Sequence, residues 1–258
     1  MSVSQEVSHR RYESGRMYPT TTDVVREALV RLHVNGQEWA MLMCTPRQLD
    51  LLALGFLHNE GIVASMKDVR RVVVCPSGAC VEVWLRDANR ELPTARILTS
   101  GCGGGVTFND LTSEAQPVLS DVTVTPQQIG QLMFKLQEGQ RYRGVHTSAL
   151  ADGDALLATA TDVGRHNTID KLCGLCLVEG ILTEDRILLT TGRVSSEMLN
   201  KAARMRIPIV ASRTSPTTLS LALAEAWHVT LVGYVRRDSL NVYTGLARVQ
   251  SHERGGAG

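Results

Sequence analysis

An alternation of strand-like and helix-like segments in the second half of the chain limits its possible folds more than any other feature. The apolar stretches ALLATATDV, RILLTT and IPIVAS are each followed by a segment with helical spacing of apolar residues, and VTLVGYVRR ends the series. This order is typical of an α/β layer with a mainly parallel sheet. The stretch LNVYTG then indicates an edge strand.

The first half of the chain has a β-rich pattern. Strand-like segments flank Asn35-Gly36, a pair typical of a tight hairpin turn, and a second hairpin is expected across PSGA. Helical spacing of apolar residues predicts helices within 47–60 and 126–140. The fold class is therefore α/β, or α+β taken as a whole, with a smaller β-rich N-terminal domain. The expected units are a flexible arm (1–25), the β-rich domain (26–143), the α/β domain (144–250) and a flexible tail (251–258).

The charge balance and the N-terminus restrict location and partners. The formal net charge is +1, so no global field favours nucleic acid. The N-terminal residues are polar, and no apolar run approaches the roughly 20 residues of a membrane helix. These features predict a cytoplasmic protein with neither a nucleic-acid nor a membrane partner. Because cytosolic thiols stay reduced, disulfides among the six cysteines are not expected.

Three strand-to-helix junctions of the second half share one design. Each carries an arginine, namely Arg165, Arg193 or Arg213. The carboxyl ends of parallel strands meet at one sheet edge, and helix N-termini and arginines both favour phosphate. The junctions therefore predict a site for a phosphate-bearing ligand, although helix caps on a solvated edge would also explain the pattern. The expected N-caps are Asn167, Ser195 and Ser215.

Four residues near these junctions receive an interpretation of their own. His166 and His146 are candidates for titration or ligand contact, and a buried structural role is about as plausible for each. Asp170 is expected to support the first helical turn, and Lys171 to face solvent or ligand.

Cys102 lies in the glycine-rich segment SGCGGG. Glycines on both sides indicate a loop with unusual dihedral angles, whose backbone N–H groups favour a reactive thiolate. Cys173 and Cys176 have the spacing of a helix core, and Cys44 is also expected in a core. Cys75 and Cys80 flank a hairpin turn. A zinc site built from these two and the helical pair is a minor alternative, because the spacing is not that of a zinc ribbon.

Several stretches together resemble the FdhD proteins, accessory sulfurtransferases of formate dehydrogenase. They run from VNGQEWAMLMC through SGCGGG, GVHTSAL, DVGRHNTIDKLCG and TTGRVSSEMLNKA to LVGYVRRDSLNVY. The resemblance covers about residues 27–243, and its two longest motifs are specific. It implies a C-terminal fold similar to cytidine deaminases, without their zinc catalysis.

The resemblance also implies a function. Such proteins take persulfide sulfur from a cysteine desulfurase and pass it to the molybdenum (or tungsten) bis-pyranopterin guanine dinucleotide cofactor of formate dehydrogenase. Cys102 matches the first cysteine of a CGxCG loop motif, whereas the second would fall on Gly105. The resemblance makes a homodimer plausible, and no tightly bound metal is expected. The guanine-dinucleotide contact that the resemblance implies falls on Tyr234, Val235, Arg236, Arg237, Asp238 and Ser239. Together with the residues already singled out at and near the junctions, namely His146, Arg165, His166, Asn167, Arg193 and Ser195, they form the expected cofactor-binding set.

Two other functions are weighed against the sulfurtransferase. A non-catalytic chaperone that delivers the molybdenum cofactor to the formate dehydrogenase apoenzyme would not need Cys102. A nucleobase deaminase would need an HxE and PCxxC zinc set, which the sequence lacks.

Overall fold

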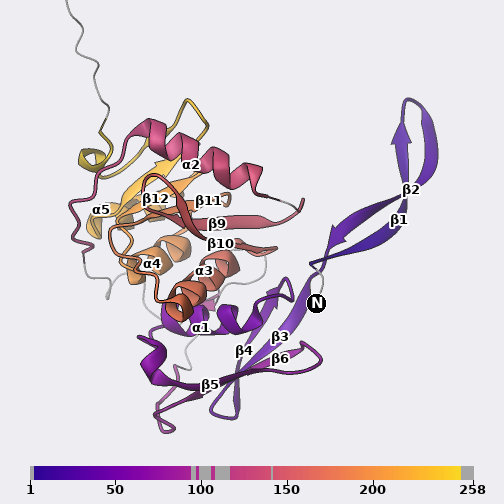
Figure 1. Ribbon diagram of the computed structural model, residues 1–258, viewed down its shortest axis with the longest axis horizontal. Coiled ribbons are helices and arrows are strands. Elements are labelled where there is room, and N and C mark those ends of the chain that lie inside the picture. Colours follow the sequence, from indigo (N-terminus) through magenta and orange to yellow (C-terminus); the bar gives the residue numbers. More distant parts are fainter. Residues whose placement is uncertain (1–2, 94–96, 99–105, 108–116, 141, 251–258) are drawn as a thin grey trace, which may run out of the picture.

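The computed structural model describes residues 3–93, 97–98, 106–107, 117–140 and 142–250, so Cys102, Gly105 and the tail lie outside the described residues. Within them, a four-stranded sheet and a six-stranded sheet form two layers with helix α1 (Leu49–Asn59) between them (Figure 1). The α/β class expected from the sequence is confirmed.

The N-terminal layer is the sheet with strand order β4-β3-β6-β5. Its first hairpin turns at Asn35 and Gly36, both with positive φ, as the sequence predicts. The strands alternate between buried and exposed side chains, and the buried face packs on α1. The strands are β3 (Ala28–Val34), β4 (Gln37–Cys44), β5 (Val69–Val74) and β6 (Cys80–Leu85), with a short 3₁₀ helix η1 (Met66–Asp68) before β5.

Helix α1 joins the two layers through a close crossing with α3 (Arg165–Glu179). A methyl group added at Gly55 would lie 1.8 Å from the carbonyl oxygen of Asp170, and one at Gly174 would lie 2.0 Å from that of Leu51. Only glycine lets these backbones approach so closely. Most α1 side chains are buried, because the sheet covers one side of the helix and α3 the other.

The C-terminal layer is a mixed sheet with strand order β10-β9-β11-β12-β13-β14. The sequence predicts a mainly parallel sheet, but only β11, β12 and β13 pair in parallel. Strand β9 inserts antiparallel between β10 and β11, so these two still run in the same direction. The predicted edge strand is confirmed in β14. The strands are β9 (His146–Ala151), β10 (Leu156–Asp162), β11 (Ile187–Thr190), β12 (Ile209–Ser212), β13 (Thr230–Gly233) and β14 (Asn241–Val242).

Helices cover both faces of this sheet. Helices α3, α4 (Ser196–Arg204) and α5 (Thr218–Ala226) pack on one face. The predicted helix α2 (Pro126–Glu138) packs on the other, with a Thr125 capping box at its start. Helix α2 thus packs on the C-terminal sheet although it precedes the boundary expected at residue 143. A short 3₁₀ helix η2 (Leu246–Arg248) follows β14. Among the described helices, none combines the length and apolar character that a membrane crossing requires.

Residues 4–25 differ from the flexible arm expected there. Strands β1 (Ser4–Glu13) and β2 (Arg16–Val25) pair over their whole length as a hairpin that extends from the body (Figure 1). Its turn is formed by Ser14 and Gly15, both with positive φ. Strand β2 is rich in the β-branched residues that favour strands, although most side chains of both strands are exposed.

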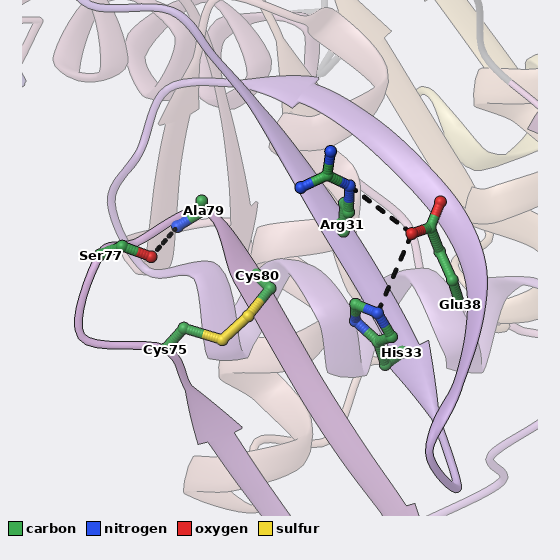
Figure 2. The surroundings of a disulfide bond; sticks show 7 residues. All are labelled: Arg31, His33, Glu38, Cys75, Ser77, Ala79 and Cys80. Atoms are coloured by element: carbon green, nitrogen blue, oxygen red, sulfur yellow. Dashed lines mark hydrogen bonds and ion pairs between the residues drawn. A yellow bond between two sulfur atoms is a disulfide. The ribbon is translucent and has the colours of Figure 1, made fainter.

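The cysteines correct one expectation. Cys75 and Cys80 are joined in a disulfide across the β5–β6 turn (Figure 2), although disulfides were not expected. Their Cα atoms are 5.4 Å apart because the hairpin places them side by side. The four-cysteine zinc alternative is thereby wrong, since Cys173 and Cys176 are buried on α3 as predicted. Cys44 is buried as well.

Candidate functional site

The three junctions meet at one edge of the C-terminal sheet. Strands β10, β11 and β12 run in the same direction, and each ends at this edge before α3, α4 or α5 begins. The amino end of β9 also lies there, because His146 pairs with Asp162. The convergence predicted from the sequence is therefore present, even though β9 interrupts the parallel order.

The first two junctions touch each other. The His166 Nε2 atom lies 3.2 Å from Ser195 Oγ and 3.4 Å from Glu197 Oε2 on α4. A methyl group on Gly192 would lie 2.8 Å from the Arg165 side chain and 3.4 Å from His146 Nδ1. Glycine at position 192 thus lets the second junction pack directly onto Arg165 and His146. The structure brings five predicted residues together here, and we call them the junction cluster: His146, Arg165, His166, Arg193 and Ser195.

Both histidines of the junction cluster resist protonation. Burial, followed by the charges of Lys201 and Arg165, lowers the pKa of His166 to about 3. Burial and Arg165 also lower the pKa of His146. At neutral pH His166 is therefore uncharged, and we place its proton on Nε2, which can then donate to Ser195 Oγ beside the Glu197 carboxylate.

The helix starts differ in detail from the prediction. Ser195 is the N-cap of α4, as expected, and its Oγ accepts from the backbone N–H of Met198. The N-cap of α3 is Gly164 rather than Asn167, and the N-cap of α5 is Thr217 rather than Ser215. Both residues predicted as N-caps have partners outside their own helix. The Asn167 side chain bonds to Met43 and Asp162, and the Ser215 carbonyl accepts from the backbone N–H of Val194.

Asn167 turns away from the junction cluster. Its side-chain amide donates to the Met43 carbonyl and to Asp162 Oδ1, at 2.8 and 2.9 Å. The backbone N–H of Thr45 donates to Asp162 Oδ2. The side chain of Asn167 therefore links the two layers through these hydrogen bonds.

Two further interpretations on α3 are wrong. Lys171 is buried rather than exposed, and its Nζ donates to Asp162 Oδ2 at 2.6 Å. Asp170 is also buried, and it pairs with Lys201 Nζ at 2.7 Å rather than supporting the helix cap. The charges that sequence reasoning missed are Asp162, Glu197 and Lys201, whose partners lie on other elements.

The C-terminal segment 234–239 is attached to the third junction. The backbone N–H of Tyr234 donates to the Thr214 carbonyl, and Arg236 Nη1 donates to the Arg213 carbonyl at 2.7 Å. Tyr234 has a positive φ and is half exposed. The segment predicted to contact a nucleotide therefore lies beside the edge where the helices begin.

The rest of this segment lines a cavity against α2. Arg237, Asp238 and Ser239 border a space of about 520 Å³ together with Gln127 and Gln131. The segment approaches α2 closely. A methyl group added at Gly130 of α2 would lie 2.2 Å from the Arg237 carbonyl oxygen. The Arg237 guanidinium stacks over Phe134, with 4.9 Å to the ring centre.

Val235 does not share this position. Its side chain is fully buried in the core beneath α2. Its side chain therefore anchors the segment in the core, and a contact of Val235 with a ligand would have to come from its backbone.

The predicted sulfur-carrying residue has no described coordinates. Cys102 lies between β7 (Ile97–Leu98) and β8 (Val106–Thr107), which pair antiparallel. Among the described residues, no three histidine, cysteine or acidic side chains are grouped in a way that could hold a metal ion.

Comparisons with known proteins place the chain among relatives of similar length. The model of the FdhD/NarQ family matches residues 25–250. A protein of Staphylococcus aureus (strain MRSA252) named sulfur carrier protein FdhD is 35% identical over 257 residues, which cover 95% of this chain and 96% of the relative. A protein of Bacillus subtilis (strain 168) with the same name is 36% identical over 249 residues, which cover 93% and 95%.

A solved structure shows the same fold. The crystal structure of a candidate formate dehydrogenase accessory protein from Desulfotalea psychrophila superposes with a TM-score of 0.83. It is 27% identical in sequence, and the match covers 96% of this chain and 100% of that one. Family match, relatives and fold all agree with the resemblance seen in the motifs. The chain therefore belongs to the FdhD/NarQ family.

Proposed function

We propose that this protein is a sulfur carrier for formate dehydrogenase. It accepts persulfide sulfur from a cysteine desulfurase on Cys102 and transfers it to the molybdenum or tungsten bis-pyranopterin guanine dinucleotide, its bound substrate. Family membership supports the sulfur-carrying part, because relatives covering nearly the whole chain are named sulfur carrier proteins. The structural neighbour's title supports the link to formate dehydrogenase.

The junction cluster is the observation that carries the binding part of the proposal. Arg165 and Arg193 lie close enough to His166 to depress its pKa, so the cluster has a positive potential around uncharged imidazoles. It also adjoins the N-terminus of α4, whose backbone N–H groups favour anions. Phosphates of a dinucleotide match both features. Arginine can hold them through two parallel hydrogen bonds, with Arg193 exposed at the edge.

The segment 234–239 is proposed to hold the guanine end. Tyr234 offers an exposed ring for stacking, and Arg237, Asp238 and Ser239 offer polar groups at the mouth of the cavity beside α2. A carboxylate such as Asp238 can accept hydrogen bonds from the guanine edge. The segment adjoins the third junction, so one extended ligand could reach both places.

The sulfur step needs one thiolate. Cys102 attacks the outer sulfur of the desulfurase persulfide, the S–S bond breaks, and the desulfurase thiolate leaves. The Cys102 persulfide then holds the sulfur for delivery to the bound cofactor. Because position 105 is glycine, Cys102 acts without a neighbouring loop thiol.

Two variants separate sulfur loading from binding. In Cys102→Ala, the peptide that contains residue 102 should gain no reducible sulfur when the protein is incubated with a cysteine desulfurase and cysteine, as read by peptide mass spectrometry, and the protein should still bind guanosine diphosphate. Arg193→Ala should load sulfur normally and bind guanosine diphosphate at least tenfold more weakly, since a charge-assisted contact contributes about 1.5–3 kcal/mol.

The same variants test the non-catalytic chaperone. If Cys102→Ala still matures formate dehydrogenase in cells lacking the wild-type protein, the chain delivers cofactor without carrying sulfur. If Arg193→Ala binds guanosine diphosphate as tightly as wild type, the junction cluster is not the phosphate site.

A further inference from the structure

The Cys75–Cys80 disulfide lies on the side of the four-stranded sheet opposite α1. Both cysteines are half-buried, whereas the other described cysteines, Cys44, Cys173 and Cys176, are buried. Figure 2 shows the bond at the end of the β5–β6 hairpin, with Arg31, His33 and Glu38 on the neighbouring strands. Among the described cysteines, this pair is thus the one that solvent and small thiols can reach.

The hairpin brings the two sulfur atoms together by itself. The backbone N–H of Cys75 donates to the Cys80 carbonyl at 2.9 Å, and that of Gly78 donates to the Cys75 carbonyl at 2.8 Å. Gly78 supplies the positive φ that the turn requires. The bond joins residues only five apart, and so short a loop gains least from a covalent link. The turn therefore does not depend on the bond, which can open and close without remodelling the sheet.

Cys80 has polar and apolar neighbours on the exposed face of the sheet. Arg31 on β3 is the parallel neighbour of Cys80, and Met41 on β4 is the antiparallel neighbour of Arg31. Paired residues share one face of a sheet, so a cation and an exposed apolar side chain lie in line with the two cysteines. Arg31 also pairs with Glu38 at 3.5 Å, so the face beside the cysteines carries charges of both signs (Figure 2).

We propose that Cys75 and Cys80 form a second sulfur-handling site, a reversible dithiol that takes the outer sulfur of a persulfide and discharges it as sulfide. The proposal rests on the proposed function in one respect, namely that a sulfur carrier encounters persulfides as its sulfur donors. It assigns to this pair the resolving chemistry that Gly105 removes from the loop of Cys102.

The reaction has two exchanges. Cys80 thiolate attacks the outer sulfur of R–S–SH, the S–S bond breaks, and R–S⁻ leaves to become R–SH. Cys75 thiolate then attacks the inner sulfur of the Cys80 persulfide, HS⁻ leaves, and the Cys75–Cys80 disulfide forms. In sum, one persulfide and two thiols give R–SH, H₂S and a disulfide; the transferred sulfur is reduced and the pair is oxidised. Two molecules of a cellular thiol reopen the bond and become a disulfide themselves.

The test uses the full-length chain with Cys102→Ala, so that the proposed carrier cannot contribute. The protein is reduced, freed of reductant and incubated without oxygen with glutathione persulfide. We expect about one equivalent of sulfide per chain above the Cys75→Ser/Cys80→Ser control in the same background, together with the disulfide-linked peptide. Cys75→Ser alone should release no extra sulfide and should accumulate a Cys80 persulfide.

Sulfide release equal to that of the double-serine control would overturn the proposal and leave a structural disulfide. Circular dichroism and urea unfolding of the double-serine chain establish that it is folded. A separate Cys75→Ser/Cys80→Ser chain that retains Cys102 tests the proposed carrier, because a desulfurase should still load sulfur onto its Cys102. Either idea can thus fail while the other stands.

Discussion

His166 shows how one residue of the junction cluster is shaped by its surroundings. The sequence places it one residue after the start of α3, where a solvent-exposed imidazole could titrate near neutrality. Burial and the neighbouring cations instead lower its pKa to about 3. The residue thus acts as a neutral hydrogen-bond donor to Ser195 beside the Glu197 carboxylate, and leaves the positive charge at this edge to the arginines.

The lowered pKa predicts a pH dependence of stability. The unfolded chain protonates His166 below about pH 6.5, whereas the folded chain does so only near pH 3, so stability present above pH 6.5 is lost as pH falls toward 3. Buried His58 and His146 act in the same direction. In His166→Gln the free energy of unfolding should fall less steeply between pH 6 and 4, by up to about 1.4 kcal/mol per pH unit. Urea titrations across this range measure it, and parallel curves would contradict the assignment.

At the scale of elements, the contact between α1 and α3 decides how the layers fit. Gly55 and Gly174 lie where the two backbones touch, so each helix places its glycine against the other's main chain. Large side chains at these points would separate the helices and open the core beside them. Glycine lowers helix stability by itself, and the buried contact offsets that cost.

Gly55→Ala tests this crossing. The added methyl would lie 1.8 Å from a backbone oxygen, so the helices must move apart, and we expect a loss of about 1–3 kcal/mol or more in the free energy of unfolding. Gly139→Ala is the matched control, because its methyl would meet nothing closer than 3.5 Å and its φ is −73°. It should be neutral, or stabilising by less than about 1 kcal/mol. Urea unfolding measures both variants, and equal changes in the free energy of unfolding would contradict the packing argument.

Across the whole molecule, buried charges connect the two layers. Asp170 accepts from Lys201 Nζ at 2.7 and 2.8 Å and from the Asn59 amide at 2.7 Å, so α3, α4 and α1 share one carboxylate. Burial opposes the charge of Lys201, but attraction to Asp170 and Glu197 leaves its pKa raised. Asp162 likewise accepts hydrogen bonds from Lys171 Nζ on α3 and from the backbone N–H of Thr45, which follows β4. These contacts fix the α1 layer against the helices that begin at the junction cluster.

Lys201→Met should remove one partner of a fully buried pair. The uncompensated Asp170 carboxylate predicts a loss of about 3–5 kcal/mol in the free energy of unfolding, and Lys201→Met/Asp170→Asn should cost less than the sum of the single changes. The exposed pair Arg206–Glu184 is the control, and Glu184→Gln should cost under about 1 kcal/mol. Additive effects of the two buried changes would contradict the coupling. Chemical denaturation of the four chains measures the cycle.

The sequence alone determined the features that depend on near neighbours. The Asn35-Gly36 turn, the cap at Ser195 and the helices 49–59 and 126–138 follow from local backbone preferences and from apolar spacing. The strand–helix alternation also predicted that the junctions meet at one edge, and the motifs identified the family. Each of these signals lies within a few residues, where propensity acts.

Tertiary structure decided what depends on distant partners. Asn167, Asp170 and Lys171 look like ordinary residues of a helix start, yet each has a partner that lies 31 to 126 residues away, and no local pattern records such a pairing. The antiparallel insertion of β9, the packing of α2 on the second layer and the pairing of Cys75 with Cys80 have the same origin. Buried charges and sheet neighbours are chosen by the assembled core, because only there does desolvation make a partner necessary.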